Sequence, residues 1–368
     1  MHIVTEPYIG KHYTELPTPC LLLDLDAVDH NIKTLQDYLD ENTECQLRPH
    51  IKTHKCPTLA HLQIRAGAIG VTCAKLGEAV VMAHSGITSI LIANQVIGEN
   101  KIKVLAGLNR YSEVMPAVDS KENIERISHW AREFGVEIPL FLEVSIGIDR
   151  CGVRTIPEAL ELAEHIMKLD NVYLKGIQAY ENRGDECQTD QEKIRFVEER
   201  VGFAAKVKET LEANGYPVEI LSSASTGTVK FTSLYPGVTE VQPGSYVQME
   251  NAYNPEKIGL PFRQALFVLA TVCSVYGERI VLTAGEKCVT IDQGQPILLD
   301  DPEARTSCNE EHCLVDMTDK LRHYKVGDNV LIKPAHCCTT VNQHDNYFCI
   351  RNGIVEDVWP IAARGRYD

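Results

Sequence analysis

One periodic feature constrains the fold most: short apolar runs rich in β-branched residues alternate with longer segments of helical periodicity. Eight runs are expected to form strands, at 45–51, 69–73, 89–93, 113–118, 139–146, 173–179, 218–223 and 238–242. Eight helices are expected at 26–43, 56–67, 75–85, 99–108, 120–134, 156–168, 188–213 and 226–234. This pattern predicts an α/β fold, a (β/α)8 TIM-type barrel. An open doubly wound sheet shares the alternation and is the alternative, but the strand count favours the barrel.

The pattern changes after about residue 260, where strand-like runs follow one another without long helices. These runs are VLATVCSVYG, RIVLTAG, NVLIKPA and YFCIRNGIVEDVW, separated by Gly, Asp and Pro turns. We therefore predict a barrel at 20–260 and a C-terminal β domain at 261–368, joined by the N-terminal segment 1–19. The apolar run CLLLDL near the N-terminus is also a candidate strand of the β domain.

Composition excludes several classes of protein. The 368 residues include 36 Lys and Arg against 51 Asp and Glu, a net charge of −15, which argues against nucleic acid or an anionic membrane as main partner. No apolar run is long enough to span a membrane, and the first residues lack the pattern of a secretion signal. The 13 cysteines are an odd number in a long chain, so we expect reduced thiols and a cytoplasmic protein.

The end of the first expected strand, RPHIKTHK (48–55), gathers five cationic or imidazole side chains. Reactive groups of a barrel lie at the carboxyl ends of its strands. Cationic neighbours favour the neutral amine with which a lysine attacks a carbonyl compound. Lys52 is therefore a candidate catalytic lysine, and a solvated basic loop is the alternative.

Small hydroxyl residues follow the seventh expected strand, in the segment 222–228 (SSASTGT). Such a loop lets backbone N–H groups approach an anion, and the loops after strands 7 and 8 are the usual phosphate site of a barrel. The segment PGSY (243–246) supplies a further hydroxyl and an aromatic ring after the eighth strand. We expect a phosphate site here, with a plain helix cap as the alternative.

The segment 333–345 (KPAHCCTTVNQHD) contains an imidazole and a thiol two residues apart, at His336 and Cys338. In an extended segment, residues i and i+2 lie on the same side and can reach one ion. A pair of ligands leaves positions open for water or substrate, which is typical of a catalytic metal site. Buried thiols without a metal are the alternative.

Several of these motifs occur together and in order: TPCLLLDLDAVDHNI, RPHIKTHK, IGIDRCGV, GIQAY, PGSY, HCCTTVNQHD and DVWPIAARG. The ordered set resembles the D-threonine aldolase family of fold-type III pyridoxal-phosphate enzymes, with D-serine dehydratase and 3-hydroxy-D-aspartate aldolase as relatives. The resemblance covers about residues 17–365. It implies an alanine-racemase-like barrel with a β domain, and it suggests a homodimer.

The resemblance also implies residue roles. Lys52 matches the lysine that binds pyridoxal 5'-phosphate covalently, Arg150 the arginine that hydrogen-bonds the ring oxygen, and Tyr180 a residue beside the ring. His336 and Cys338 match the ligands of a divalent metal, zinc or manganese, and with Lys52 they form the expected catalytic set. The expected phosphate-side residues are Ser223, Ser225, Thr226, Gly227, Thr228 and Tyr246.

This chain departs from the family pattern at several places. Aldolase relatives usually have His-Cys-Asp where this chain has His336-Cys337-Cys338, and dehydratase relatives have His-x-Cys. Aldolase relatives also carry Gly-Gly-Gly-Thr-Gly in place of residues 223–227, Asp in place of Thr283 and Gly in place of Cys313. A thiolate ligand favours zinc over manganese.

The same groups could serve two reactions on a D-3-hydroxy amino acid. Loss of the hydroxyl proton with cleavage of the Cα–Cβ bond gives glycine and an aldehyde, which is retro-aldol cleavage. Loss of the α proton with departure of hydroxide gives an enamine, which water converts to a 2-oxo acid and ammonia. We expect the retro-aldol lyase, with a dehydratase of the D-serine or D-hydroxyaspartate type as the alternative. A racemase or a non-catalytic cofactor carrier would not need the metal pair.

Overall fold

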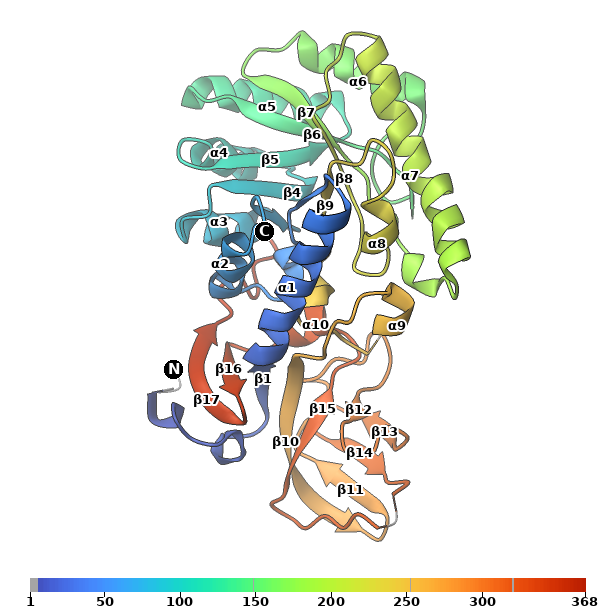
Figure 1. Cartoon of the computed structure of the whole chain (residues 1–368). Coiled ribbons are helices and arrows are strands. Elements are labelled where there is room, and N and C mark those ends of the chain that lie inside the picture. The colour runs from blue at the N-terminus through green and yellow to red at the C-terminus, as the bar shows by residue number, and fades with distance from the viewer. Residues whose placement is uncertain (1–5, 148, 252, 320) are drawn as a thin grey trace.

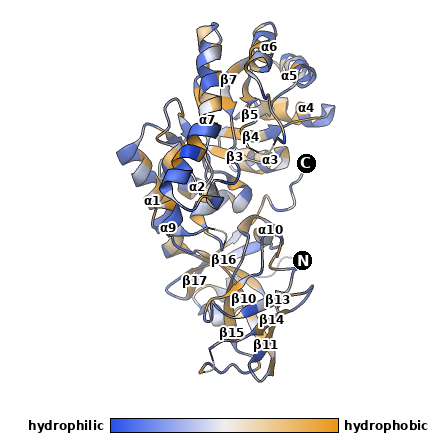
Figure 2. Cartoon of the chain, turned by 90° about the vertical axis from the view of Figure 1, so that its right-hand side faces the viewer, coloured by the Kyte–Doolittle hydropathy of each residue, from blue (hydrophilic) through white to orange (hydrophobic). Residues whose placement is uncertain are grey.

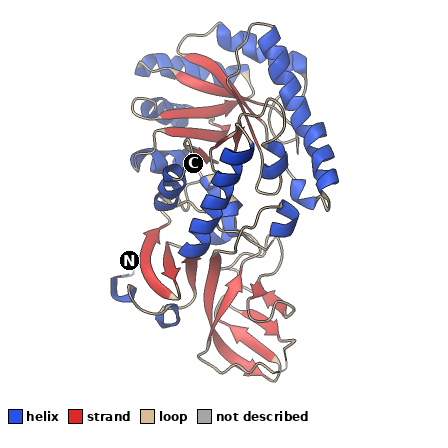
Figure 3. Cartoon of the chain, viewed as in Figure 1, coloured by secondary structure: helices blue, strands red, loops and turns tan. Residues whose placement is uncertain are grey.

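The computed structural model describes residues 6–147, 149–251, 253–319 and 321–368. Its strands form two sheets, one of eight strands and one of nine. Figure 1 shows the eight-stranded part with its helices above and the second sheet below. Figure 3 shows helices around the first sheet and mainly strands and loops in the second part.

The eight-stranded sheet is parallel, in the order β2-β9-β8-β7-β6-β5-β4-β3. Its strands are β2 Gln46–Leu47, β3 Val71–Cys73, β4 Ser89–Gln95, β5 Glu113–Val118, β6 Ile138–Glu143, β7 Val172–Gln178, β8 Ile220–Ser223 and β9 Glu240–Val241. An isolated parallel bridge joins His50 to Thr72, and the Thr72 N–H donates to the Pro49 carbonyl at 2.9 Å. These contacts connect the two outer strands, so the sheet closes into the predicted barrel.

Helices follow the strands as the alternating pattern predicts. They are α1 Leu25–Asn42, α2 Pro57–Arg65, α3 Leu76–His84, α4 Glu99–Leu108, α5 Lys121–Phe134, α6 Ile156–Met167, α7 Asp190–Ala213 and α8 Val229–Thr232. The predicted helix at 226–234 is shorter than expected, because Ser225 to Thr228 form a turn before α8.

The barrel strands are buried on both faces, which explains their nearly continuous apolar sequence. All six residues of β6 are buried. Inside the barrel, Leu91, Met115 and Phe141 pack together with Ile220, while alternate residues such as Leu221 join the larger core beneath the helices. Figure 2 shows apolar residues concentrated on these strands and mixed colours on the helices around them.

The second sheet has the order β13-β14-β11-β10-β1-β16-β17, with β15 beside β10 and β12 beside β15. Its strands are β1 Cys20–Asp24, β10 Leu266–Tyr276, β11 Arg279–Leu282, β12 Ile297–Leu298, β13 Arg305–Cys308, β14 Cys313–Asp316, β15 Asn329–Lys333, β16 Asn346–Arg351 and β17 Ile354–Pro360. Strand β1 lies between β10 and β16, so the CLLLDL run joins this sheet as its apolar pattern indicated. The preceding segment also contacts it, since the Gly10 N–H donates to the Val355 carbonyl.

One expectation about local structure is wrong. The segment after His336 is not extended but forms α10 Cys337–Val341, and only His336 itself keeps an extended backbone, at φ −138° and ψ 119°. The buried Glu250 carboxylate accepts a hydrogen bond from the Cys337 N–H, which satisfies a donor at the start of the helix. A partner so distant in the sequence leaves no local signal.

All thirteen cysteines are free thiols. None of the helices in the described part of the chain is both long and apolar enough to cross a bilayer.

Candidate active site

Lys52 lies just beyond β2, in a short 3-10 helix, Ile51–Thr53, that begins after His50. Its Nζ lies 5.6 Å from the centre of the Tyr180 ring. Tyr180 follows β7, which lies three places from β2 in the order of the sheet. The structure therefore brings together two side chains that are 128 positions apart in the sequence and that were both expected beside the cofactor ring.

The neighbouring Lys55 has a different environment. It is 8% exposed and forms an ion pair with the buried Glu78 carboxylate. Glu78 also accepts hydrogen bonds from the N–H groups of Ala74, at 2.7 Å, and Lys75, at 3.2 Å. Lys55 and Glu78 line the same cavity as Lys52, but the Lys55 amine is held in this buried ion pair, whereas the half-buried Lys52 places its amine near the Tyr180 ring.

Of the two histidines around Lys52, His54 is fully buried and His50 is partly buried. Burial lowers the pKa of His54 to about 3. Burial, together with the charges of Lys52 and Lys55, holds the pKa of His50 well below its ordinary value. Both imidazoles are therefore neutral near pH 7, and they do not place additional positive charge beside Lys52.

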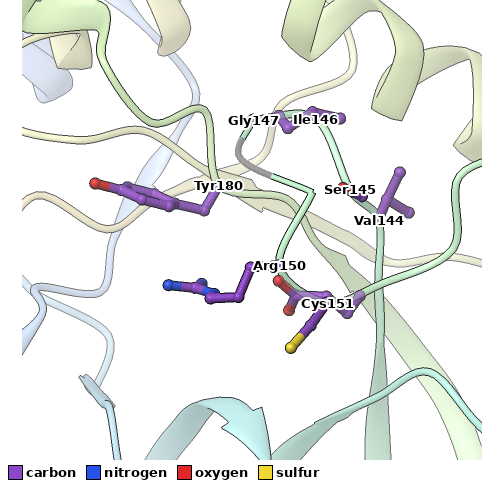
Figure 4. A pocket seen from close by; sticks show the side chains of 8 residues that line it. Val144, Ser145, Ile146, Gly147, Arg150, Cys151 and Tyr180 are labelled. Atoms are coloured by element: carbon purple, nitrogen blue, oxygen red, sulfur yellow. The ribbon is translucent and has the colours of Figure 1, made fainter.

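Arg150 and Tyr180 line a small cavity at the ends of β6 and β7, together with Glu143 and Cys151. Figure 4 shows the Arg150 side chain and the Tyr180 ring extending in the same direction, one below the other. Glu143, at the end of β6, is buried, and its Oε2 has no hydrogen-bond partner among the described residues. Burial raises the pKa of Glu143 to about 8, with a smaller contribution from Asp119, against the lowering effect of Arg150.

The loop 223–228 binds an anion that belongs to the chain itself. The fully buried Glu181 carboxylate accepts hydrogen bonds from the Ser223 hydroxyl, at 2.8 Å, and from the N–H groups of Ala224 and Ser225, both at 3.0 Å. The Thr228 hydroxyl also donates to it. Glu181 was not expected from the sequence to have a role, although it directly follows GIQAY.

The remaining residues of the expected phosphate side take different positions. The Thr226 hydroxyl accepts a hydrogen bond from the Tyr246 N–H at 3.1 Å. The Tyr246 phenol is fully buried, and its oxygen accepts a hydrogen bond from Gln63 at 2.8 Å. Gly227 lines a cavity of about 230 Å³ whose wall includes Lys193 and Lys257. The Tyr246 backbone thus contacts the loop, while its hydroxyl points to a barrel helix.

His336 and Cys338 lie beside each other at the start of α10. The Nδ1 of His336 is 2.7 Å from an Asp292 carboxylate oxygen, and the other oxygen of Asp292 accepts a hydrogen bond from Thr339 at 2.9 Å. This arrangement leaves Nε2 of His336 as the atom available to a metal ion. Asp292 was not expected from the sequence, because it lies in an irregular segment 44 positions before the histidine.

The two side chains favour opposite charges, an imidazolium at His336 and a thiolate at Cys338, so a metal ion would have to displace the His336 proton. Burial lowers the pKa of His336, but hydrogen bonds to Cys338 and Asp292 outweigh it and raise the value to about 9. Hydrogen bonds from Cys337 and His336, with the charge of Lys52, hold the pKa of Cys338 well below its ordinary value. In contrast, burial raises the pKa of Cys337. A thiolate at Cys338 is the form that binds metals.

A cavity of about 490 Å³ connects Lys52 to Cys338. Its wall also includes Thr290, Asn342 and Tyr367, whose hydroxyl accepts a hydrogen bond from Asn342 at 2.6 Å. Helix α10 contacts the 3-10 helix that carries Lys52, and Figure 1 places α10 at the junction of the barrel and the second sheet. The cavity therefore lies where the two parts of the molecule meet.

Comparisons with known proteins show which family the whole chain resembles. Residues 23–252 match the family described as alanine racemase, N-terminal domain, and residues 265–350 match the putative serine dehydratase domain. The chain is 33% identical to D-threonine aldolase of Arthrobacter sp., over 97% of this chain and 95% of that protein. It is 34% identical to 3-hydroxy-D-aspartate aldolase of Paracoccus denitrificans, over 97% and 94%.

Solved structures show the same likeness over the whole chain. The crystal structure of D-threonine aldolase from Filomicrobium marinum matches with a TM-score of 0.94 and 33% identity, over 98% of both chains. D-threo-3-hydroxyaspartate dehydratase from Delftia sp. HT23 matches with a TM-score of 0.86 and 26% identity, over 95% of this chain and 98% of the other. A variant of that dehydratase with a cysteine changed to alanine was solved in a metal-free form.

Proposed function

Because the chain belongs to the D-threonine aldolase family, whose members of known activity include carbon–carbon lyases, we propose that it cleaves a D-3-hydroxy amino acid to glycine and an aldehyde. The observation that carries this proposal is the single cavity lined by both Lys52 and Cys338. One residue suits covalent attachment of pyridoxal phosphate, and the other suits a metal ion next to the substrate hydroxyl.

The residues present fit pyridoxal 5'-phosphate. Lys52 offers an amine, the Tyr180 ring lies 5.6 Å from it, and Arg150 lies at the end of the adjacent strand. On the phosphate side we assign Thr226 and Gly227, with Ser223, Ser225, Thr228 and Tyr246 shaping the loop around them. When bound, the cofactor supplies an electron sink for the bond that breaks.

The residues also fit a divalent metal that is held by few protein ligands. Within residues 6–147, 149–251, 253–319 and 321–368, no group of three or more His, Cys, Asp or Glu side chains could hold an ion. Two ligands, His336 Nε2 and Cys338 Sγ, leave positions open for the substrate hydroxyl and water, as a catalytic ion requires. Imidazole and thiolate favour zinc, with manganese as the alternative. Such an ion supplies a Lewis acid for the hydroxyl.

The chain's own residues then have defined tasks. Lys52 Nζ would hold the cofactor, and its amine would be the group beside the reacting carbon that can accept or return a proton. Asp292 orients His336 through Nδ1. In the cleavage, the hydroxyl proton is removed, the Cα–Cβ bond breaks to release the aldehyde, and a proton is added to Cα to give glycine.

Dehydration is the second candidate, because Cys338 replaces the aspartate of aldolase relatives. D-threo-3-hydroxyaspartate dehydratase of Delftia sp. is 27% identical over 90% of this chain. In that reaction Lys52 would remove the α proton and the hydroxyl would leave as water, which gives an enamine. Hydrolysis of the enamine by water then gives a 2-oxo acid and ammonia.

One incubation distinguishes the two reactions. The purified protein is incubated with D-threonine, pyridoxal phosphate and zinc or manganese, and the products are separated. Acetaldehyde with equimolar glycine supports the lyase, and 2-oxobutanoate with ammonia supports the dehydratase. L-Threonine serves as the control substrate. With 3-hydroxy-D-aspartate the corresponding products are glyoxylate with glycine, or oxaloacetate with ammonia. Absence of all these products with both substrates would contradict the proposal.

A further inference from the structure

We propose that Glu181 is a positioning residue for the cofactor phosphate. Its buried carboxylate accepts hydrogen bonds from backbone N–H groups of the loop 223–228, from the side of the helices, and so fixes the loop's shape. This inference rests on the proposed function, since it takes pyridoxal phosphate as the cofactor. It assigns a role to a residue that is not itself expected to touch the cofactor.

Several hydrogen-bond donors converge on the Glu181 side chain. Glu181 is fully buried and accepts from two backbone N–H groups and from hydroxyls. The hydroxyls are those of Ser223, Thr228 and Thr232, the last at 3.4 Å. A buried carboxylate is stable only when its oxygens are paired in this way. The donors that a phosphate could use at Ala224 and Ser225 are therefore already engaged.

Glu181 lies on the side of the sheet that faces the helices. Successive residues of a strand point to opposite faces. Ser222 points into the barrel, where its hydroxyl donates to Glu240, and Ile220 packs inside with Phe141. Ser223 therefore points outward, toward the helices, and it is Ser223 that donates to Glu181. The carboxylate thus supports the loop from the helix side, opposite the barrel interior that Ser222 faces.

The backbone of Ala224 has an unusual conformation. Its φ is +77°, in the left-handed region that favours glycine. Consecutive N–H groups in such a conformation form a nest that binds an anion. The hydrogen bonds of Ala224 and Ser225 to Glu181 hold the loop in this conformation although a methyl group opposes it. Relatives with glycine at this position have no methyl group to oppose this conformation.

The test compares two ligands that differ only in the phosphate. Pyridoxal phosphate and pyridoxal are each titrated into the full-length protein after removal of cofactor, and binding is followed by the absorption band of the lysine-bound ring. In Glu181→Gln we expect pyridoxal phosphate to bind at least tenfold more weakly and pyridoxal to change less than twofold. Glu186→Gln is the matched control, because Glu186 lies on the same segment and is paired with Arg183 near the surface.

A second variant changes Ala224, whose backbone is in the left-handed region. Glycine adopts this φ without strain, so we expect the double variant Glu181→Gln, Ala224→Gly to bind pyridoxal phosphate at least threefold more tightly than Glu181→Gln alone. Where Glu181→Gln does not fold, Glu181→Asp, which keeps the charge but shortens its reach, is expected to show a smaller loss with the same dependence on the phosphate.

Three results would overturn the proposal. Equal weakening of both ligands would make Glu181 a general stability residue. Unchanged affinity for both would remove it from the cofactor site. Tighter binding of pyridoxal phosphate in Glu181→Gln would mean that the carboxylate competes with the phosphate. Failure of the unaltered protein to bind either ligand would instead contradict the proposed function.

Discussion

The two sides of the proposed active site, the proposed phosphate side and the proposed metal side, are built in different ways. The phosphate side is formed within the barrel, where the loop after β8 is held by Glu181 after β7. The metal side joins the two sheets, because α10 lies between β15 and β16 yet its Cys338 shares a cavity with Lys52 after β2. One side therefore depends on the barrel alone, and the other depends on how the two sheets pack together.

This difference has a consequence for experiments. Changes on the barrel side should act on cofactor affinity and on stability. Changes on the side of α10 should act on metal content and on turnover while the cofactor stays bound. Lys52 lies where the two sides meet, and its removal should abolish both.

The largest expected effect is that of Lys52→Ala. Loss of the amine that holds the cofactor should reduce turnover by at least about 10³-fold and remove the absorption band of bound pyridoxal phosphate. Lys55→Ala is the control from the same segment. It should lower stability by about 3 kcal/mol, because Glu78 is left buried without its partner, yet leave the band in place. Loss of the band in Lys55→Ala alone would show that the wrong lysine has been chosen.

The next effect concerns the metal. A chelator should abolish turnover but leave the bound-cofactor band and the folded state, because two ligands at the cavity wall do not hold the fold together. Cys338→Asp should restore the ligand set of aldolase relatives and shift the preference from zinc toward manganese. Metal content by elemental analysis and turnover with each ion are the measurements. Full turnover after chelation, with no ion found, would contradict the metal assignment.

The sequence predicted the barrel side better than the junction. Each of the eight expected barrel strands overlaps an observed strand, because a buried parallel strand needs an apolar run that is visible locally. Lys52, Arg150 and Tyr180 were placed by motif order, and the structure brings Lys52 and Tyr180 together. The roles expected for these residues toward the cofactor remain predictions.

The junction could not be predicted because its determinants are distant in sequence. Segment 337–341 is helical since Glu250, 87 positions earlier, accepts from its first N–H. Asp292 is likewise identified only by its contact with His336. Glu181 was missed for another reason: an acidic residue next to a loop of donors looks like surface charge until its burial is known.

A smaller effect should appear in the pH dependence of stability, through Glu143 on the barrel side. Its pKa is raised to about 8 by burial, so the folded protein binds one more proton than the unfolded chain between about pH 4.5 and 8. Stability should therefore fall as pH rises through this range. Glu143→Gln should remove about 3 kcal/mol of that fall between pH 5.5 and 8.5, measured by urea unfolding at both pH values. Parallel pH curves for the two proteins would show that Glu143 is ionised in the fold.

The smallest effect is expected for Cys337→Ser, which tests whether the metal side depends on one thiol. Cys337 is fully buried and its Sγ lies 3.6 Å from the Ser245 hydroxyl, away from the cavity that Cys338 lines. A serine hydroxyl can donate there, so we expect a loss of about 1 kcal/mol of stability, turnover within about threefold and unchanged metal content. Cys338→Ser, beside it, should lose the metal although the chemical change is the same. If Cys337→Ser instead lost the metal and Cys338→Ser kept it, the ligand would be Cys337, and the helical start of α10 would present the opposite thiol to the substrate.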